Sequence, residues 1–189
     1  MQSAVLQMAL ACMLLGTLST AHAMTDIAAP LPIQQQFTQK LQAAGQGQMR
    51  FLGLRIYDAR LWVGPGFEAQ SFTNYPLALE LTYHRNFTGK AIAERSVQEI
   101  ARQRTVPPDL AQRWTDQLTQ WLPDVKLGDR LTGIYIPSQG MQLWLGDKAL
   151  SPINDTELAQ RFFGIWLSPQ TSEPRLREAL LAEIGKASP

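Results

Sequence analysis

The chain of 189 residues carries 17 lysines and arginines and 16 aspartates and glutamates, so its formal net charge is +1 at pH 7. This balance excludes the basic surface typical of proteins that bind nucleic acid. No block of like charges marks a segment that would adhere to a membrane surface. The length suits one domain with a sizeable core.

Residues 1–23 are predicted to be a secretory signal peptide that is cleaved after Ala23. This segment contains no lysine, arginine, aspartate or glutamate, and it ends in Ala-His-Ala at positions 21–23. Its apolar run, residues 4–18, is short for a bilayer span. Two alternatives stay open, a lipoprotein modified at Cys12 and an uncleaved anchor. The main prediction is a periplasmic or secreted protein without stable membrane insertion after cleavage.

After cleavage, residues 24–36 are expected to form an N-terminal arm rich in proline and alanine, and residues 37–189 a single domain. The same cleavage removes Cys12 and His22, which leaves His84 as the one imidazole and no thiol. We therefore expect no disulfide, no zinc site built from cysteine and histidine, and no cofactor.

Residues 48–63 are predicted to be extended, but their apolar pattern changes phase near Tyr57. Side chains alternate faces along a strand, so this change indicates a bulge or a break between two strands. A second strand is predicted in residues 76–87, where leucines and Tyr83 alternate with Glu80 and other residues. The members of the two phases in the first segment are Leu52, Leu54 and Ile56, then Tyr57, Ala59, Leu61 and Val63.

Two amphipathic helices are predicted next. Thr88 is the expected N-cap of the first, and Pro107-Pro108-Asp109 separates it from the second. The apolar positions recur every three to four residues, as in helices that pack on one side. They are Ala93, Val97, Ile100 and Ala101 in the first helix and Leu110, Trp114, Leu118 and Trp121 in the second.

A hairpin is predicted in residues 131–146, and both of its faces are apolar. Asn154-Asp155-Thr156-Glu157 resembles a capping box that opens a further helix, and Ser172 is expected to cap the last one. Early strands, paired helices and a returning hairpin indicate an α+β fold, with an antiparallel sheet and helices packed on one face.

Candidate chemistry centres on few residues. His84 is either a general base or, the favoured interpretation, an exposed histidine at a strand end, because no G-x-S-x-G nucleophile motif accompanies it. Arg55 and Arg60 are expected to face water beside Asp58. Arg50 is either solvated or internally paired, or it faces a ligand anion, which would offset the cost of burying its charge.

Four segments together resemble the chalcone isomerase-like family of secreted bacterial proteins across residues 41–181. This resemblance implies an open-faced β-sandwich, in which a large antiparallel sheet carries a helical layer on one face and short strands on the other. The segments are GQGQMRFLGLRIYDARLW, LELTYHRNFTGKAIAE, VKLGDRLTGIYIPSQGMQLWLGD and FFGIWLSPQTSEPRLREALL.

Plant enzymes of this superfamily close a flavanone ring in a cleft that uses an arginine, a threonine, a tyrosine and an asparagine. By the resemblance, the arginine corresponds to Arg50, the threonine to Tyr57 or Asp58, the tyrosine to Ile92 and the asparagine to Glu99. A fixed cation there stabilises developing enolate charge. Only the arginine matches, which argues against isomerase activity.

Other relatives keep the arginine and bind fatty acids in the same cleft. The resemblance therefore implies a non-catalytic protein that binds a small amphipathic acid such as a fatty acid. Two alternatives stay open, an intramolecular lyase or isomerase of the chalcone-to-flavanone type and a module that docks an envelope protein. The predicted ligand-binding residues are Arg50, Tyr57, Tyr83 and Thr88, and the candidate cavity walls are Trp62, Phe87, Trp144, Phe162 and Phe163.

Overall fold

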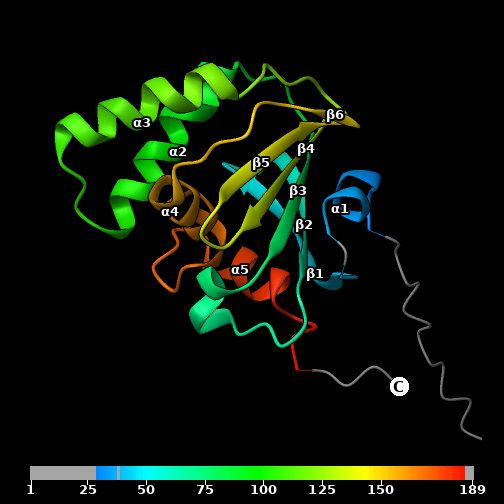
Figure 1. Cartoon of the computed structure of the whole chain (residues 1–189). Coiled ribbons are helices and arrows are strands. Elements are labelled where there is room, and N and C mark those ends of the chain that lie inside the picture. Colours follow the sequence, from blue (N-terminus) through cyan, green and yellow to red (C-terminus); the bar gives the residue numbers. More distant parts are fainter. Residues whose placement is uncertain (1–28, 38, 186–189) are drawn as a thin grey trace, which may run out of the picture.

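The computed structural model describes residues 29–37 and 39–185, so the predicted signal peptide lies outside the described residues. The strands form one antiparallel sheet in chain order (Figure 1), which confirms the α+β prediction. They are β1 (Gln42–Phe51), β2 (Leu54–Val63), β3 (Leu77–Tyr83), β4 (Arg130–Ile136), β5 (Gly140–Leu145) and β6 (Lys148–Ala149).

As predicted, the helical layer packs on one face of this sheet. Helices α2, α4 and α5 contribute to the main core on one face, and α3 packs on α2. The short α1 lies on the other face (Figure 1), where short strands were expected. The helices are α1 (Leu31–Gln36), α2 (Gly89–Gln103), α3 (Pro108–Trp121), α4 (Thr156–Leu167) and α5 (Pro174–Leu180), with a 3-10 segment, η1 (Ala69–Asn74), between β2 and β3.

Side chains of β2 alternate between two separate cores. Ala59, Leu61 and Val63 are buried in the main core under the helices. Trp62 points the other way and packs with Ile33 of α1 in a small second core. Part of the predicted N-terminal arm therefore covers this end of the sheet and shields its apolar side chains from water.

The phase change predicted near Tyr57 is confirmed as a bulge in β2, because Met49 pairs with Tyr57 while Arg50 pairs with Arg55, which leaves Ile56 as an extra residue. β1 and β2 are joined by a tight turn at Leu52 and Gly53, whose φ angles of 49° and 79° are both positive. Two positive φ angles in a two-residue hairpin loop define a type I′ turn.

The predicted cap at Thr88 is confirmed, as is the helix start predicted at Asn154-Asp155-Thr156-Glu157, where Asp155 is the N-cap. Thr88 Oγ1 accepts a hydrogen bond from the Ala91 amide at 3.2 Å at the start of α2. Asp155 accepts from the Leu158 amide at 2.9 Å at the start of α4. The Ser172 prediction is wrong, because Glu173 is the residue before α5 and makes no side-chain cap there. In the part of the chain that the structure describes, no helix is long and apolar enough to cross a membrane.

Candidate functional site

A cavity of about 360 Å³ lies between the helix-covered face of the sheet and helices α2, α4 and α5. Its size falls in the range of pockets that hold small organic ligands. Its walls are largely apolar, because the strands and helices that meet there turn their core side chains inward. The apolar walls include Met49, Phe51, Leu81, Phe87, Phe162 and Leu176.

Two tyrosines place hydroxyl groups among these apolar walls. The Tyr57 hydroxyl accepts a hydrogen bond from Trp166 Nε1 at 3.0 Å. The rings of Tyr57 and Tyr83 pack edge to face, with their centroids 5.9 Å apart. Burial raises the pKa of the Tyr57 phenol above its ordinary value, although the Trp166 bond partly opposes this effect. Burial likewise raises the pKa of Tyr83. Both phenols therefore stay protonated at neutral pH, and Tyr57 retains an O–H that can donate.

A charged cluster contributed by α2 and the segment before α5 borders the same cavity. Arg95 Nη2 lies 2.6 Å from Glu99 Oε1, and Ser172 Oγ donates to Glu99 Oε2 at 2.6 Å. The Arg95 side chain is 50% exposed, whereas that of Glu99 is 8% exposed. Glu173 also lines the cavity, so one cation and two acids meet there. A buried carboxylate needs such partners, because its desolvation is costly.

The structure separates the four predicted ligand-binding residues. Tyr57 and Tyr83 line the cavity. Arg50 is exposed, and its chain neighbours Met49 and Phe51 line the cavity instead. The placement of Arg50 inside the cavity is therefore wrong, because strand alternation turns it away from the side that its neighbours face.

Thr88 is exposed, and it caps α2 rather than lining the cavity. Among the predicted walls, Phe87 and Phe162 line the cavity, whereas Phe163 is buried in the core beside it. The wall prediction is wrong for Trp62 and Trp144, which belong to the small core on the other face of the sheet.

Three positions identified through the family resemblance do converge here. Tyr57, Ile92 and Glu99 all line the cavity. Arg95 and Trp166 also line the cavity, although neither was predicted from the sequence as a binding residue. Arg95 precedes Glu99 by four residues, which is the spacing of an ion pair on one helix face, and this signal was available.

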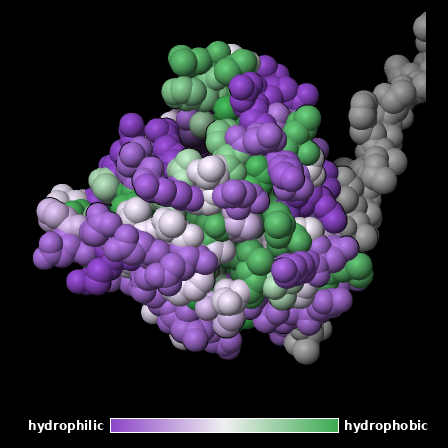
Figure 2. Space-filling view, turned by 90° about the horizontal axis from the view of Figure 1, so that it is seen from above, coloured by the Kyte–Doolittle hydropathy of each residue, from purple (hydrophilic) through white to green (hydrophobic). Residues whose placement is uncertain are grey.

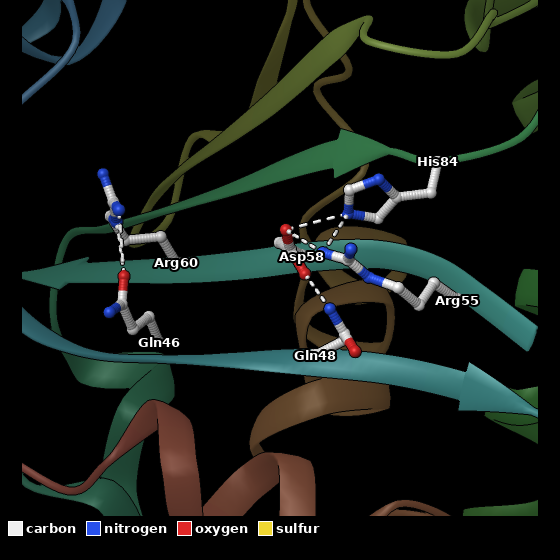
Figure 3. A network of polar contacts seen from close by, with 6 residues as sticks. All are labelled: Gln46, Gln48, Arg55, Asp58, Arg60 and His84. Carbon is white, nitrogen blue, oxygen red and sulfur yellow. Dashed lines mark hydrogen bonds and ion pairs between the residues drawn. The ribbon is translucent and has the colours of Figure 1, made fainter. Parts of the chain in front are cut away.

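The opposite face of the sheet carries a polar network centred on Asp58 (Figure 3). Gln48 Nε2 donates to Asp58 Oδ1 at 2.7 Å, and His84 Nε2 lies 2.8 Å from Oδ2. Arg55 Nη2 lies 3.4 Å from the same oxygen. Burial favours a higher pKa for Asp58, but the hydrogen bonds from Gln48 and His84 and the charges of His84 and Arg55 outweigh it, so the pKa is lowered.

This arrangement corrects two sequence predictions. Asp58 pairs with Arg55 and His84, while Arg60 binds Gln46 Oε1 through Nε at 3.2 Å and Nη2 at 2.9 Å. His84 is half-buried rather than exposed. In the described residues, no serine, threonine or cysteine side chain is hydrogen-bonded to this imidazole, so the Asp58–His84 pair lacks the nucleophile of a catalytic triad.

The same network borders a polar groove of about 420 Å³ on this face. Glu80 lies in it and is only 7% exposed. Burial raises the pKa of Glu80, although Arg130 and Arg60 oppose the shift. Within the described ranges, no group of three or more histidine, cysteine, aspartate or glutamate side chains is placed to hold a metal ion.

The comparisons with known proteins identify the family. The sequence profile described as chalcone isomerase-like matches residues 21–182. The chain belongs to the chalcone isomerase-like family. Its fold is shared by the crystal structure of a fatty-acid binding protein from Arabidopsis thaliana, with a TM-score of 0.55 and 11% sequence identity, over 75% of this chain and 86% of that one.

This chalcone isomerase-like chain is also 31% identical over 108 residues to a protein of Haemophilus influenzae described as uncharacterized. That match covers 57% of this chain and 52% of the relative, so it spans about half of the relative's length.

Proposed function

We propose that this protein binds a small amphipathic acid, such as a fatty acid, in the cavity between the sheet and helices α2, α4 and α5, and that it does so without catalysing a reaction. The observation that carries this proposal is an apolar cavity of about 360 Å³ with two neutral phenols among its walls. Apolar walls with a few polar groups that fix orientation are typical of small-molecule sites.

The head group of such an acid has three candidate donors. Tyr57 and Tyr83 supply hydroxyls from the sheet, and Arg95 supplies a guanidinium with five N–H groups. The contact with Glu99 engages Nη2 of this guanidinium, so other N–H groups can donate to a ligand. Glu99 and Glu173 line the same cavity and oppose a carboxylate by repulsion. The proposal therefore assigns orientation to the phenols and to Arg95, and most of the binding free energy to burial of the apolar tail.

The structural neighbour supports this choice of ligand class. That neighbour is a fatty-acid binding protein, and it shares the fold of this chain. At 11% identity the likeness extends to the fold, so the ligand assignment rests on the cavity itself.

A titration with straight-chain fatty acids of increasing length tests the proposal. Ala91 lines the cavity yet is exposed, so Ala91→Trp should fill the cavity without disturbing the core. We expect this variant to bind at least about tenfold more weakly, since a tail excluded from the cavity loses its apolar burial. Gln98→Trp, at an exposed position of the same helix outside the cavity lining, is the matched control. Equal binding by Ala91→Trp and wild type would contradict the proposal.

The isomerase alternative has its own test. Incubation with 2′-hydroxychalcone should leave the enone absorbance unchanged, because Ile92 offers no hydroxyl and Glu99 opposes an oxyanion. Protein-dependent loss of that absorbance would replace the binding proposal with a catalytic one.

We also propose that the protein acts in the periplasm or outside the cell after cleavage following Ala23. The support is the sequence alone, an uncharged apolar segment that ends in small residues. Mass spectrometry of the protein from its native host should give a mature N-terminus at Met24. A chain retaining the first 23 residues would overturn this assignment.

A further inference from the structure

The tip of the β1–β2 hairpin exposes three large apolar side chains in four consecutive residues. Leu52 is 87% exposed, Phe51 53% and Leu54 51%. Figure 2 shows hydrophobic residues projecting from one edge of the molecule with hydrophilic residues beside them. We name Phe51–Leu54 the hairpin tip. Contiguous exposed apolar residues on a folded domain mark a surface that meets an apolar partner.

The backbone gives a second reason to assign a role to Leu52. Its φ of 49° is positive, and Gly53 follows with a φ of 79°. A type I′ turn strongly prefers asparagine and glycine at these two positions, since a side chain with a large Cβ substituent is strained there. Leucine is thus unfavourable for the backbone conformation of this turn, and the side chain of Leu52 is not buried in the core either. A role outside the folded chain accounts for a leucine at this position.

Cations surround the hairpin tip. Arg50 and Arg55 are directly opposite each other in the ladder. Like charges in that arrangement destabilise a hairpin unless an anion lies between or near them. Arg55 contacts Asp58, whereas Arg50 forms no ion pair within the part of the chain that the structure describes.

Two neighbouring segments add charge and one more exposed leucine at this end of the sheet. The His84 amide donates to the Ile56 carbonyl at 2.8 Å, which holds the exposed Arg85 near the start of β2. The Leu127 amide donates to Asn86 Oδ1 at 2.9 Å, which brings Lys126 to the same end. Leu127 is 68% exposed. The acids nearby, Asp58 and Asp129, are already engaged by hydrogen bonds.

The hairpin tip is continuous with the cavity. Met49, Phe51 and Ile56 belong to the same hairpin and line the cavity wall. Phe51 therefore belongs both to the exposed hairpin tip and to the cavity wall.

We propose that the hairpin tip docks on the surface of a lipid bilayer that contains anionic phospholipid, with Phe51, Leu52 and Leu54 in the acyl boundary and the surrounding cations on the phosphates. Exposed apolar side chains flanked by arginine and lysine are suited to this interface, where burial and attraction to anionic head groups act together. This inference goes beyond the proposed ligand binding and does not depend on it.

Co-sedimentation of the purified protein with vesicles tests the proposal. We expect binding to vesicles of phosphatidylcholine with phosphatidylglycerol, and weaker binding to phosphatidylcholine alone or at raised salt. Leu52→Asn should lower the partition coefficient about tenfold, because one leucine leaves the acyl boundary. The same change should raise the unfolding temperature, since asparagine suits a type I′ turn. A loss of vesicle binding by this variant cannot then be ascribed to misfolding.

Leu31→Asn removes another exposed leucine, which is 55% exposed and lies on α1 away from the hairpin, and this variant should bind vesicles as the wild type does. Ala91→Trp, which fills the cavity, should also bind vesicles normally, so the docking and ligand proposals can fail separately. Unchanged binding by Leu52→Asn would overturn the proposal. Absence of vesicle binding by the wild type would also overturn the proposal, and a protein would then be the expected partner of the hairpin tip.

Discussion

The helix-covered face and the opposite face of the sheet are built from the same strands but carry different chemistry. On the covered face, Leu61 of β2 is fully buried in the main core, and Tyr57 lines the cavity. On the opposite face, Asp58 and Arg60 of the same strand border a polar groove with Glu80. Strand alternation alone separates the two sets, because successive side chains point to opposite faces.

The difference shows where stability and ligand binding originate. Burial of apolar side chains under the helices contributes kilocalories per residue, so the covered face fixes the fold and leaves a cavity where packing is incomplete. Hydrogen bonds and ion pairs that stay partly in water contribute less than about 1 kcal/mol each. The polar network of Figure 3 therefore orders side chains on the opposite face more than it holds the sheet together.

Adjacent substitutions in β2 give the largest expected contrast. Leu61→Ala should lower the free energy of unfolding by about 3 kcal/mol, since it leaves a hole in a fully buried site. Arg60→Ala should lower it by less than about 1 kcal/mol, although it loses two hydrogen bonds to Gln46. Urea denaturation of both variants measures the difference. Similar losses for the two would show that the faces contribute equally.

Charge at the cavity offers the next contrast. Arg95→Gln should weaken the binding of a carboxylate ligand about tenfold, because it removes a charged hydrogen-bond donor. Glu99→Gln keeps the shape and the contact with Ser172 but removes a competing anion, so it should bind the same acid more tightly. Titration of both variants with one fatty acid and with its methyl ester measures the effect. A loss of affinity in Arg95→Gln that is equal for the ester would assign Arg95 to packing alone.

Much of this architecture follows from local patterns in the sequence. The apolar periods of α2 and α3, the caps at Thr88 and Asp155, and the phase change ahead of Tyr57 each have a short-range physical cause, and the structure contains each of them. The family resemblance also identified positions that reach the cavity, namely Tyr57, Ile92 and Glu99.

The site was harder to predict because it depends on which face a residue takes and which distant segment it meets. Arg50 was assigned to the cavity, but alternation places its neighbours Met49 and Phe51 there. Ser172 donates its hydroxyl hydrogen bond to Glu99, which is 73 positions away in the chain. Its side chain therefore does not cap the helix that follows, although its local sequence had indicated that it would. The cations around the hairpin tip come from separate segments, so no run of charge reveals them in the sequence.

Glu80 is the exception on the polar face, since it is buried there. Burial raises the pKa of this carboxyl, so the fold favours its neutral form, and that contribution to stability is lost as the pH rises through the folded-state pKa. Glu80→Gln should therefore raise the free energy of unfolding at pH 7 by about 1 kcal/mol. Below the ordinary pKa of 4.5 the gain should vanish. A loss of stability at pH 7 would mean that the contact with Arg130 outweighs the cost of burial.

Asp58 should behave in the opposite sense, with the smallest effect. Its pKa is lowered, so the fold favours the ionised form, and the resulting stability is present above the ordinary pKa of 3.8 and is lost as the pH falls through the folded-state value. Asp58→Asn should cost well under about 1 kcal/mol at pH 7, because the side chain is 45% exposed and its ion pairs are screened by solvent.

Unfolding curves of Asp58→Asn and wild type, recorded at several pH values, should converge as the pH falls, whereas those of Glu80→Gln and wild type should separate as the pH rises. The two carboxylates lie on one face of the sheet and border one groove. Burial nevertheless raises the pKa of Glu80, whereas for Asp58 the hydrogen bonds and nearby charges together outweigh burial and lower the pKa. If the free energies of unfolding of Asp58→Asn and wild type differed by the same amount at every pH, the effect would come from lost contacts with Gln48 and His84 rather than from the charge of Asp58.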